Sequence, residues 1–108
     1  MEVYLKGKII GYDAKGEYDK DTRKLIVYKD SKVSPDVSYS KTFKAAIKIE
    51  ELRKETVENG IVLRNIEFPS ASTAANFVTG RSTNGMIAWK TSEGKTLNEE
   101  ICGYNPYF

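Results

Sequence analysis

Residues 68–90 read FPSASTAANFVTGRSTNGMIAWK, and this stretch decides how the rest of the chain is organised. Ser70 is placed to cap a short helix, because its hydroxyl can accept a hydrogen bond from a backbone amide two or three residues later. The small and apolar residues that follow favour a closely packed helix, which Gly80 ends. Asn84 and Gly85 predict a tight turn, because both residues tolerate positive φ.

A longer helical pattern precedes this stretch. Apolar residues recur every three or four positions between Phe43 and Val57, which predicts an amphipathic helix with charged side chains on its outer face. Ser40 is the candidate N-cap, and Asn59-Gly60 is expected to end the helix. The apolar residues expected on its buried stripe are Phe43, Ala46, Ile47, Ile49, Leu52 and Val57.

Extended segments surround both helices. The expected strands are residues 3–10, 12–18, 25–28, 61–68 and 86–90, and residues 96–101 form either a final strand or a helical turn. Gly16–Lys29 predicts a β-hairpin around the polar turn Asp19–Thr22, because Asp side chains hydrogen-bond to nearby backbone amides. The sequence therefore predicts an α+β fold, a mostly antiparallel sheet of about five strands with one long and one short helix.

Composition limits the possible functions. The 108 residues, 40% hydrophobic and 30% charged, predict one globular domain over residues 1–108. The chain has no histidine and one cysteine, Cys102, which excludes histidine-dependent catalysis and the common zinc and iron–sulfur sites. We expect no metal, no cofactor and no enzymatic activity, although an enzyme built on Tyr, Arg, Lys and Glu remains open. No signal peptide or membrane segment is evident, so we expect a cytoplasmic protein with no membrane partner.

Charge is unevenly distributed along the chain. The formal net charge is +2, but residues 1–54 hold 13 Lys or Arg against 9 Asp or Glu. Seven basic residues and two acidic ones lie between Arg23 and Lys48. This local excess either faces phosphates or is an ordinary lysine-rich surface in contact with water.

Polar and basic side chains gather at the predicted turns, where binding residues concentrate in many proteins. The candidate nucleic-acid-binding residues are Arg81, Ser82, Asn84, Lys90, Lys95, Ser70, Ser72, Lys29 and Lys32. The basic members would contact phosphates, and Ser82 and Asn84 would lie near a base or sugar edge.

Several of these residues also have a purely structural interpretation. Ser70 and Ser72 are placed to cap a helix, and Asn84 to form a turn. Arg81 either grips phosphate or satisfies the last carbonyls of the short helix. Trp89 is expected to pack in the core, with stacking on a nucleic-acid base as the alternative.

Residues 68–90, followed by Glu93–Leu97, resemble the pattern F-S-S-P-S-A-A-A…G-R-S-x-N-G-W-x-x-W-K…D-G-K-T-L of a bacterial family, domain of unknown function 4357. Upstream, Ala14–Gly16 and Val27–Lys32 resemble the hairpin of that family. The resemblance covers roughly residues 13–100, with the strand 3–10 and the tail 103–108 as extensions. The chain departs from the pattern at Asp30, Ala71 and Met86, which replace Gly, Pro and Trp.

The resemblance implies a small accessory domain. Family members occur alone or appended to GIY-YIG nuclease and restriction–modification proteins, and the family is more distantly similar to the RAMA domain, a proposed reader of modified DNA. It implies binding to DNA, with sensitivity to base modification in a restriction or defence setting.

The alternative is a protein-interaction or assembly module, whose partner would be a nuclease or another restriction-system protein. An exposed edge strand at residues 3–10 would then pair with that partner. The oligomeric state stays open at this level.

Overall fold

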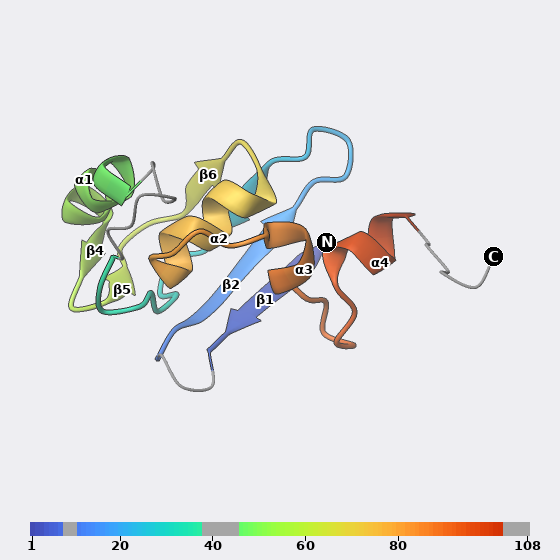
Figure 1. Cartoon of the computed structure of the whole chain (residues 1–108), viewed down its shortest axis with the longest axis horizontal. Coiled ribbons are helices and arrows are strands. Elements are labelled where there is room, and N and C mark those ends of the chain that lie inside the picture. The colour runs from blue at the N-terminus through green and yellow to red at the C-terminus, as the bar shows by residue number, and fades with distance from the viewer. Residues whose placement is uncertain (8–10, 38–45, 103–108) are drawn as a thin grey trace.

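The computed structural model describes residues 1–7, 11–37 and 46–102, and it confirms the α+β class (Figure 1). Strands β1 (Glu2–Lys6), β2 (Asp13–Tyr18), β3 (Leu25–Val27) and β6 (Ile66–Phe68) form an antiparallel sheet in the order β1-β2-β3-β6. A separate ribbon pairs β4 (Val57–Glu58) with β5 (Ile61–Val62). The helices are α1 (Ala46–Thr56), α2 (Ala71–Thr79), α3 (Gly85–Ala88) and α4 (Leu97–Cys102).

The sheet has one buried face and one face in contact with solvent. Along β2 the side chains of Ala14 and Tyr18 are buried, whereas those of Asp13, Lys15 and Glu17 are exposed. The same alternation holds in the other three strands, as the period of two in an extended chain requires. The buried face carries Val3, Leu5, Ala14, Tyr18, Leu25, Val27, Ile66 and Phe68.

Helix α2 crosses the buried face of the sheet (Figure 1). It has the local signals that the sequence predicts, because the Ser70 hydroxyl accepts from the Thr73 amide at 3.1 Å and Gly80 ends the helix at φ 71°. The Phe77 ring is fully buried and lies 5.1 Å from the ring of Phe68 on β6. Aromatic contact therefore joins the helix to the sheet.

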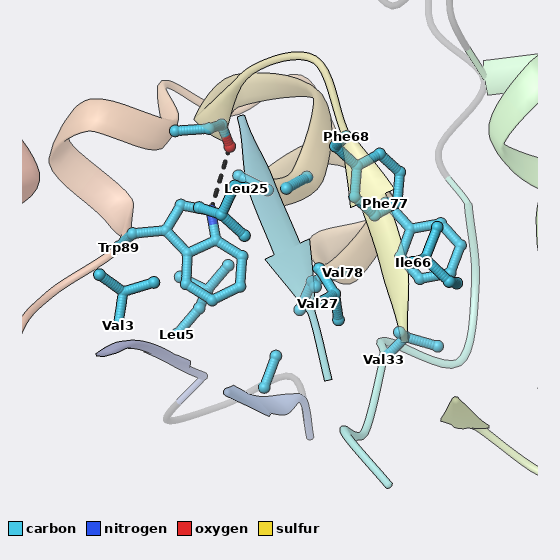
Figure 2. Packing of buried hydrophobic residues seen from close by; sticks show 14 of the residues in the cluster. Val3, Leu5, Leu25, Val27, Val33, Ile66, Phe68, Phe77, Val78 and Trp89 are labelled. Atoms are coloured by element: carbon cyan, nitrogen blue, oxygen red, sulfur yellow. Dashed lines mark hydrogen bonds between the residues drawn. The ribbon is translucent and has the colours of Figure 1, made fainter. Parts of the chain in front are cut away.

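The segment after α2 is locked to the beginning of that helix. Trp89 is fully buried, as expected, and its indole N–H donates to the Ala71 carbonyl at 3.0 Å (Figure 2). The Gly85 amide donates to the Ser72 hydroxyl at 3.0 Å. A Cβ on Gly85 would lie 2.1 Å from the carbonyl carbon of Ala71, so only glycine fits this contact.

A buried arginine joins α1 to the other end of α2. The guanidinium of Arg53 donates to the carbonyls of Phe77 at 2.6 Å, Val78 at 3.2 Å and Ser34 at 2.8 Å. Burial lowers the pKa of Arg53 to about 10, an effect that Asp36 opposes, so the group stays protonated at neutral pH. A cation at the C-terminal end of a helix interacts favourably with the helix dipole.

Two Asn-Gly pairs have roles opposite to those predicted. Asn59 and Gly60, at φ 52° and 79°, form the two-residue turn between β4 and β5, and α1 ends earlier, at Thr56. Asn84-Gly85 is not a turn with positive φ, because Asn84 has φ −78° and its side chain caps α3 by accepting from the Met86 amide. Residues 86–90 consequently begin as a helix and not as a strand.

Two further expectations are corrected, and one pair of alternatives is decided. Ile47 is 64% exposed, because Ala46, Ile49, Arg53 and Thr56 form the buried face of α1. The expected strand 61–68 is divided into β5 and β6, which belong to different sheets. Of the two alternatives for residues 96–101, the helical one is confirmed, since α4 begins at Leu97, directly after the isolated bridge between Thr96 and Lys90.

The hairpin at residues 16–29 is confirmed, with the Asp19 carboxylate accepting from the Asp21 amide at 2.8 Å. The expected first strand is shorter than predicted, since β1 ends at Lys6 and residues 8–10 lie outside the described residues. The proposed N-cap Ser40 and the apolar Phe43 also lie outside them. Within the described parts of the chain, no helix has the length and apolar composition that a membrane span needs.

The contact between Gly85 and α2 predicts a strong effect of one methyl group. We expect Gly85→Ala to lower the free energy of unfolding by about 2 kcal/mol, because the added Cβ overlaps the Ala71 backbone. Urea denaturation followed by circular dichroism measures the change. Gly11→Ala is the matched control, since its Cβ would meet only the end of the Lys32 side chain at 3.4 Å. Equal stability of the two variants would contradict this packing.

Candidate functional site

Three of the sequence-predicted site residues are engaged in local structure. The hydroxyl of Ser70 and the side chain of Asn84 cap α2 and α3 respectively, and the hydroxyl of Ser72 accepts from Gly85. The capping role expected of Ser70 is therefore confirmed. Ser72 lies inside α2 and does not cap it, and Asn84 caps a helix in place of forming the expected turn. All three belong to the helical layer over the buried face of the sheet.

Arg81 and Ser82 are exposed in the loop after α2. The last carbonyls of α2, at Phe77 and Val78, accept from Arg53, so the capping role considered for Arg81 is wrong. Within residues 1–7, 11–37 and 46–102, the Arg81 guanidinium makes no hydrogen bond or ion pair. Lys95 lies in a different turn, where its ammonium group is 4.0 Å from the Glu93 carboxylate.

Lys90 occupies the outer edge of the sheet. The Tyr4 amide donates to the Lys90 carbonyl at 2.7 Å, and the Lys90 amide donates to the Tyr4 carbonyl at 2.9 Å. The β1 edge, expected to be open for a partner strand, is thus engaged at Tyr4. Because directly paired residues of antiparallel strands place their side chains on the same face, Lys90 joins Tyr4 on the solvent face.

The strand register places further side chains beside Lys90 and Tyr4 across the solvent face of the sheet. Tyr4 pairs with Lys15 on β2, and the Tyr28 amide, just after β3, donates to the Lys15 carbonyl at 2.9 Å. Lys90, Tyr4, Lys15 and Tyr28 consequently follow one another on the solvent face, and we call them the cation–tyrosine row. The Lys15 ammonium lies 5.8 Å from the centre of the Tyr4 ring, within the range of a cation–π interaction.

Carboxylates border the row on one side. Glu2 and Glu17 pair with each other two residues from Tyr4 and Lys15, on the same face. The Tyr4 hydroxyl donates to Glu2 at 3.2 Å, and the Tyr28 hydroxyl donates to Glu17 at 3.3 Å. These bonds hold both rings close to the sheet, since Tyr4 reaches Glu2 on its own strand and Tyr28 reaches Glu17 on the neighbouring strand.

Lysines predominate on the other side of the row. Lys6 pairs with Asp13, and Asp13 is bridged in turn to Lys32. Lys29 directly follows Tyr28, is exposed, and is held by its backbone amide, which donates to the Asn65 side chain at 2.8 Å. The solvent face of the sheet therefore passes from acidic, through aromatic, to mainly basic.

The pairs in the row fix its protonation states. The ammonium of Lys15, 3.1 Å from Glu2, lowers the pKa of the Glu2 carboxyl, and Glu2 raises the pKa of Lys15 in return. Partial burial, followed by the neighbouring Glu17, raises the pKa of Tyr28. At neutral pH the site therefore presents an ammonium, carboxylates and an uncharged phenol.

The structure brings together only part of the predicted site. Lys90, Lys29 and Lys32 lie on or beside the cation–tyrosine row, whereas Ser70, Ser72, Arg81, Ser82 and Asn84 belong to the helical layer. Sequence reasoning missed Tyr4, Lys15 and Tyr28. The alternation of residues 12–18 indicates an exposed Lys15, but only the long-range pairing of Lys90 with β1 reveals the row.

A family model described as a domain of unknown function (DUF4357) matches residues 3–101. The chain belongs to the DUF4357 family. No curated protein and no solved structure matches it. The match includes β1, so the row lies wholly within the DUF4357 domain and not partly on an N-terminal extension.

The motif that carries the DUF4357 resemblance builds the junction of α2 and α3. Its Ser70, Ser72, Gly85 and Trp89 all take part in the caps and contacts at the beginning of α2. Asp30, which replaces a Gly of the pattern, has φ 72°, a conformation that glycine adopts freely.

The other two departures from the pattern also fit their positions. Ala71, in place of Pro, is the first residue of α2, where proline's fixed φ suits a helix. Met86, in place of Trp, is half-buried and packs against the core. The substitution therefore removes an aromatic side chain from the helical layer and leaves the cation–tyrosine row unchanged.

The Glu2–Lys15 pair predicts a measurable titration. We expect the Glu2 carboxyl to titrate below 4.5 and Lys15→Met to raise its pKa, because the substitution removes the ammonium. Because the pKa of Glu2 is lower in the folded protein than in the unfolded chain, the pair stabilises the fold at pH values above the unfolded pKa. This contribution is lost as the pH falls through the folded pKa. Both groups are well exposed, so the effect on stability is small. NMR titration of the side-chain carboxyl measures the pKa; the same value in both proteins would contradict the pairing.

Proposed function

We propose that this DUF4357 domain binds nucleic acid on the solvent face of its sheet. The observation that carries the proposal is the cation–tyrosine row, in which two lysines alternate with two tyrosines across paired strands. Aromatic side chains on a sheet surface stack with bases, and lysines neutralise phosphates. Both kinds of side chain are available here on one surface.

DNA is the proposed nucleic acid, as a component of a restriction or defence system. This choice rests on the resemblance of residues 68–90 to a family whose members accompany nuclease and restriction–modification proteins. Sensitivity to base modification is part of the same proposal, since a stacked base presents its edges to neighbouring side chains. Catalysis is not part of it.

A second function is favoured by the helical layer. Residues 68–92 contain no Asp or Glu, although these make up 15 of the 108 residues, and Ile87 on α3 is 58% exposed. Surfaces that contact other proteins are depleted of charged residues at their centres and enriched in arginine, which Arg81 supplies beside this layer. An assembly module would use this face, opposite the cation–tyrosine row, so the two functions are compatible.

Paired lysine variants test the nucleic-acid proposal. We expect Lys15→Ala with Lys90→Ala to weaken binding of labelled single-stranded DNA roughly tenfold at about 50 mM salt, because two phosphate contacts are lost. The slope of log affinity against log salt concentration should fall by roughly 0.7 for each lysine. Fluorescence anisotropy measures both quantities, with duplex DNA, adenine-methylated duplex and RNA as further ligands.

Lys48→Ala with Lys54→Ala is the matched control, since both residues are exposed on α1 and the net charge changes equally. If the two double variants lose the same affinity, the effect comes from net charge alone, and the assignment of the binding site to the cation–tyrosine row is contradicted. Absence of binding by the unmodified protein to every ligand at low salt would overturn the nucleic-acid function itself.

The aromatic half of the row has its own test. We expect Tyr28→Ala to weaken single-strand binding about tenfold, because stacking on a base contributes roughly 1–3 kcal/mol. Tyr28→Phe should retain most of the affinity, since it keeps the ring and loses only the hydroxyl bond to Glu17. Anisotropy titrations compare the two. If phenylalanine weakens binding as much as alanine does, stacking is not the contact that Tyr28 makes.

A further inference from the structure

We infer that the cation–tyrosine row selects guanine in single-stranded nucleic acid, with Glu17 as the residue that recognises the base stacked on Tyr28. This inference rests on the proposed function and names the class of ligand for the same site. It follows from the order of charge across the sheet face, from the contact between the two side chains, and from the chemistry of base edges.

The charges on the solvent face of the sheet set the direction in which a bound nucleic-acid strand would lie. The carboxylates of Glu2 and Glu17 border one side of the row, and two lysines with one carboxylate between them, Lys6, Asp13 and Lys32, border the other. Phosphates are repelled by the first border and attracted by the second, so the sugar–phosphate backbone lies on the lysine side. The bases then extend across the tyrosines, and their Watson–Crick edges meet the carboxylates. A step of two residues along a strand is about 7 Å, close to the length of a base with its sugar bond.

Glu17 is the better placed of the two carboxylates. Its Oε2 accepts from the Tyr28 hydroxyl at 3.3 Å, which puts the carboxylate at the rim of the ring on which a base would stack. Its Oε1 lies 3.7 Å from the Met1 ammonium, a longer contact than the 3.1 Å between Glu2 and Lys15. A carboxylate has about four acceptor positions, so Glu17 retains acceptor capacity for a base.

Guanine matches a carboxylate better than the other bases do. Its Watson–Crick edge presents two adjacent donors, the N1–H and the N2 amino group, which a carboxylate accepts together. Cytosine and adenine each present one amino donor beside an acceptor, and thymine presents one donor between two carbonyls, which a carboxylate repels. In a duplex these edges are paired, so recognition by Glu17 requires a single strand.

The test compares oligonucleotides that differ in one base. Anisotropy is measured for the whole chain with labelled ten-nucleotide thymine strands that carry a central guanine, cytosine, adenine or thymine. We expect the guanine strand to bind about tenfold more tightly than the all-thymine strand. Glu17→Gln should remove this preference, because the amide keeps one acceptor oxygen and places an N–H group against the second guanine donor. The all-thymine strand should bind with equal or higher affinity, because the change removes a negative charge near the phosphates.

Glu67→Gln is the matched control. Glu67 is exposed on β6, at the far edge of the sheet, and pairs with Lys24 at 3.4 Å, so the same charge change there should leave the guanine preference intact. Thermal denaturation confirms that each variant folds. Equal binding of all four strands, or a guanine preference that survives Glu17→Gln, would overturn the inference while the proposed function stands. Absence of binding to every strand would overturn both.

Discussion

The hydrogen bond from the indole of Trp89 to the Ala71 carbonyl is the contact on which the arrangement depends. It fixes the segment after α3 against the beginning of α2, and the close approach of Gly85 to the same carbonyl leaves no other position for it. Lys90 follows Trp89 directly and is thereby delivered to the edge of β1. A buried aromatic anchor thus places a lysine in line with residues more than 60 positions earlier in the chain.

The two faces of the sheet differ in what they carry. The buried face holds α2, which the Arg53 guanidinium ties at its C-terminal end to the loop around Ser34. Most residues of the motif that carries the family resemblance take part in this internal packing. The solvent face holds the cation–tyrosine row, which the strand register places on the side of the sheet away from the helices. The stabilising contacts thus lie on one face of the sheet, and the proposed binding surface lies on the other.

Local signals predicted the parts of the fold that depend on local chemistry. Helix α2 begins after Ser70 and ends at Gly80, as these residue types indicate. The Asp19 carboxylate stabilises the turn between β2 and β3 by accepting from a nearby amide, which its residue type also indicates. The two Asn-Gly pairs show where such signals end. At residues 59–60 the pair supplies positive φ for a turn, whereas at residues 84–85 the glycine is needed for its missing side chain. Nothing in the dipeptide itself distinguishes the two uses.

The site was harder to predict, because it is a product of long-range pairing. Lys29, Lys32 and Lys90 are basic residues near predicted turns, and the position of Lys32 and Lys90 on one face with Tyr4 and Lys15 depends on long-range strand pairing. Arg53 shows the same limit, since a charged residue within a helix carries no local sign that it will be buried against carbonyls.

The central claim is that the solvent face of the sheet, and not the helical layer, contacts nucleic acid. A two-dimensional amide NMR titration with a ten-nucleotide single strand tests it most directly. The account predicts that the largest shifts fall on the amides of β1, β2, Tyr28 and Lys90, with those of α2 and Arg81 nearly unchanged. Shifts confined to α2, Arg81 and the beginning of α3 would contradict it.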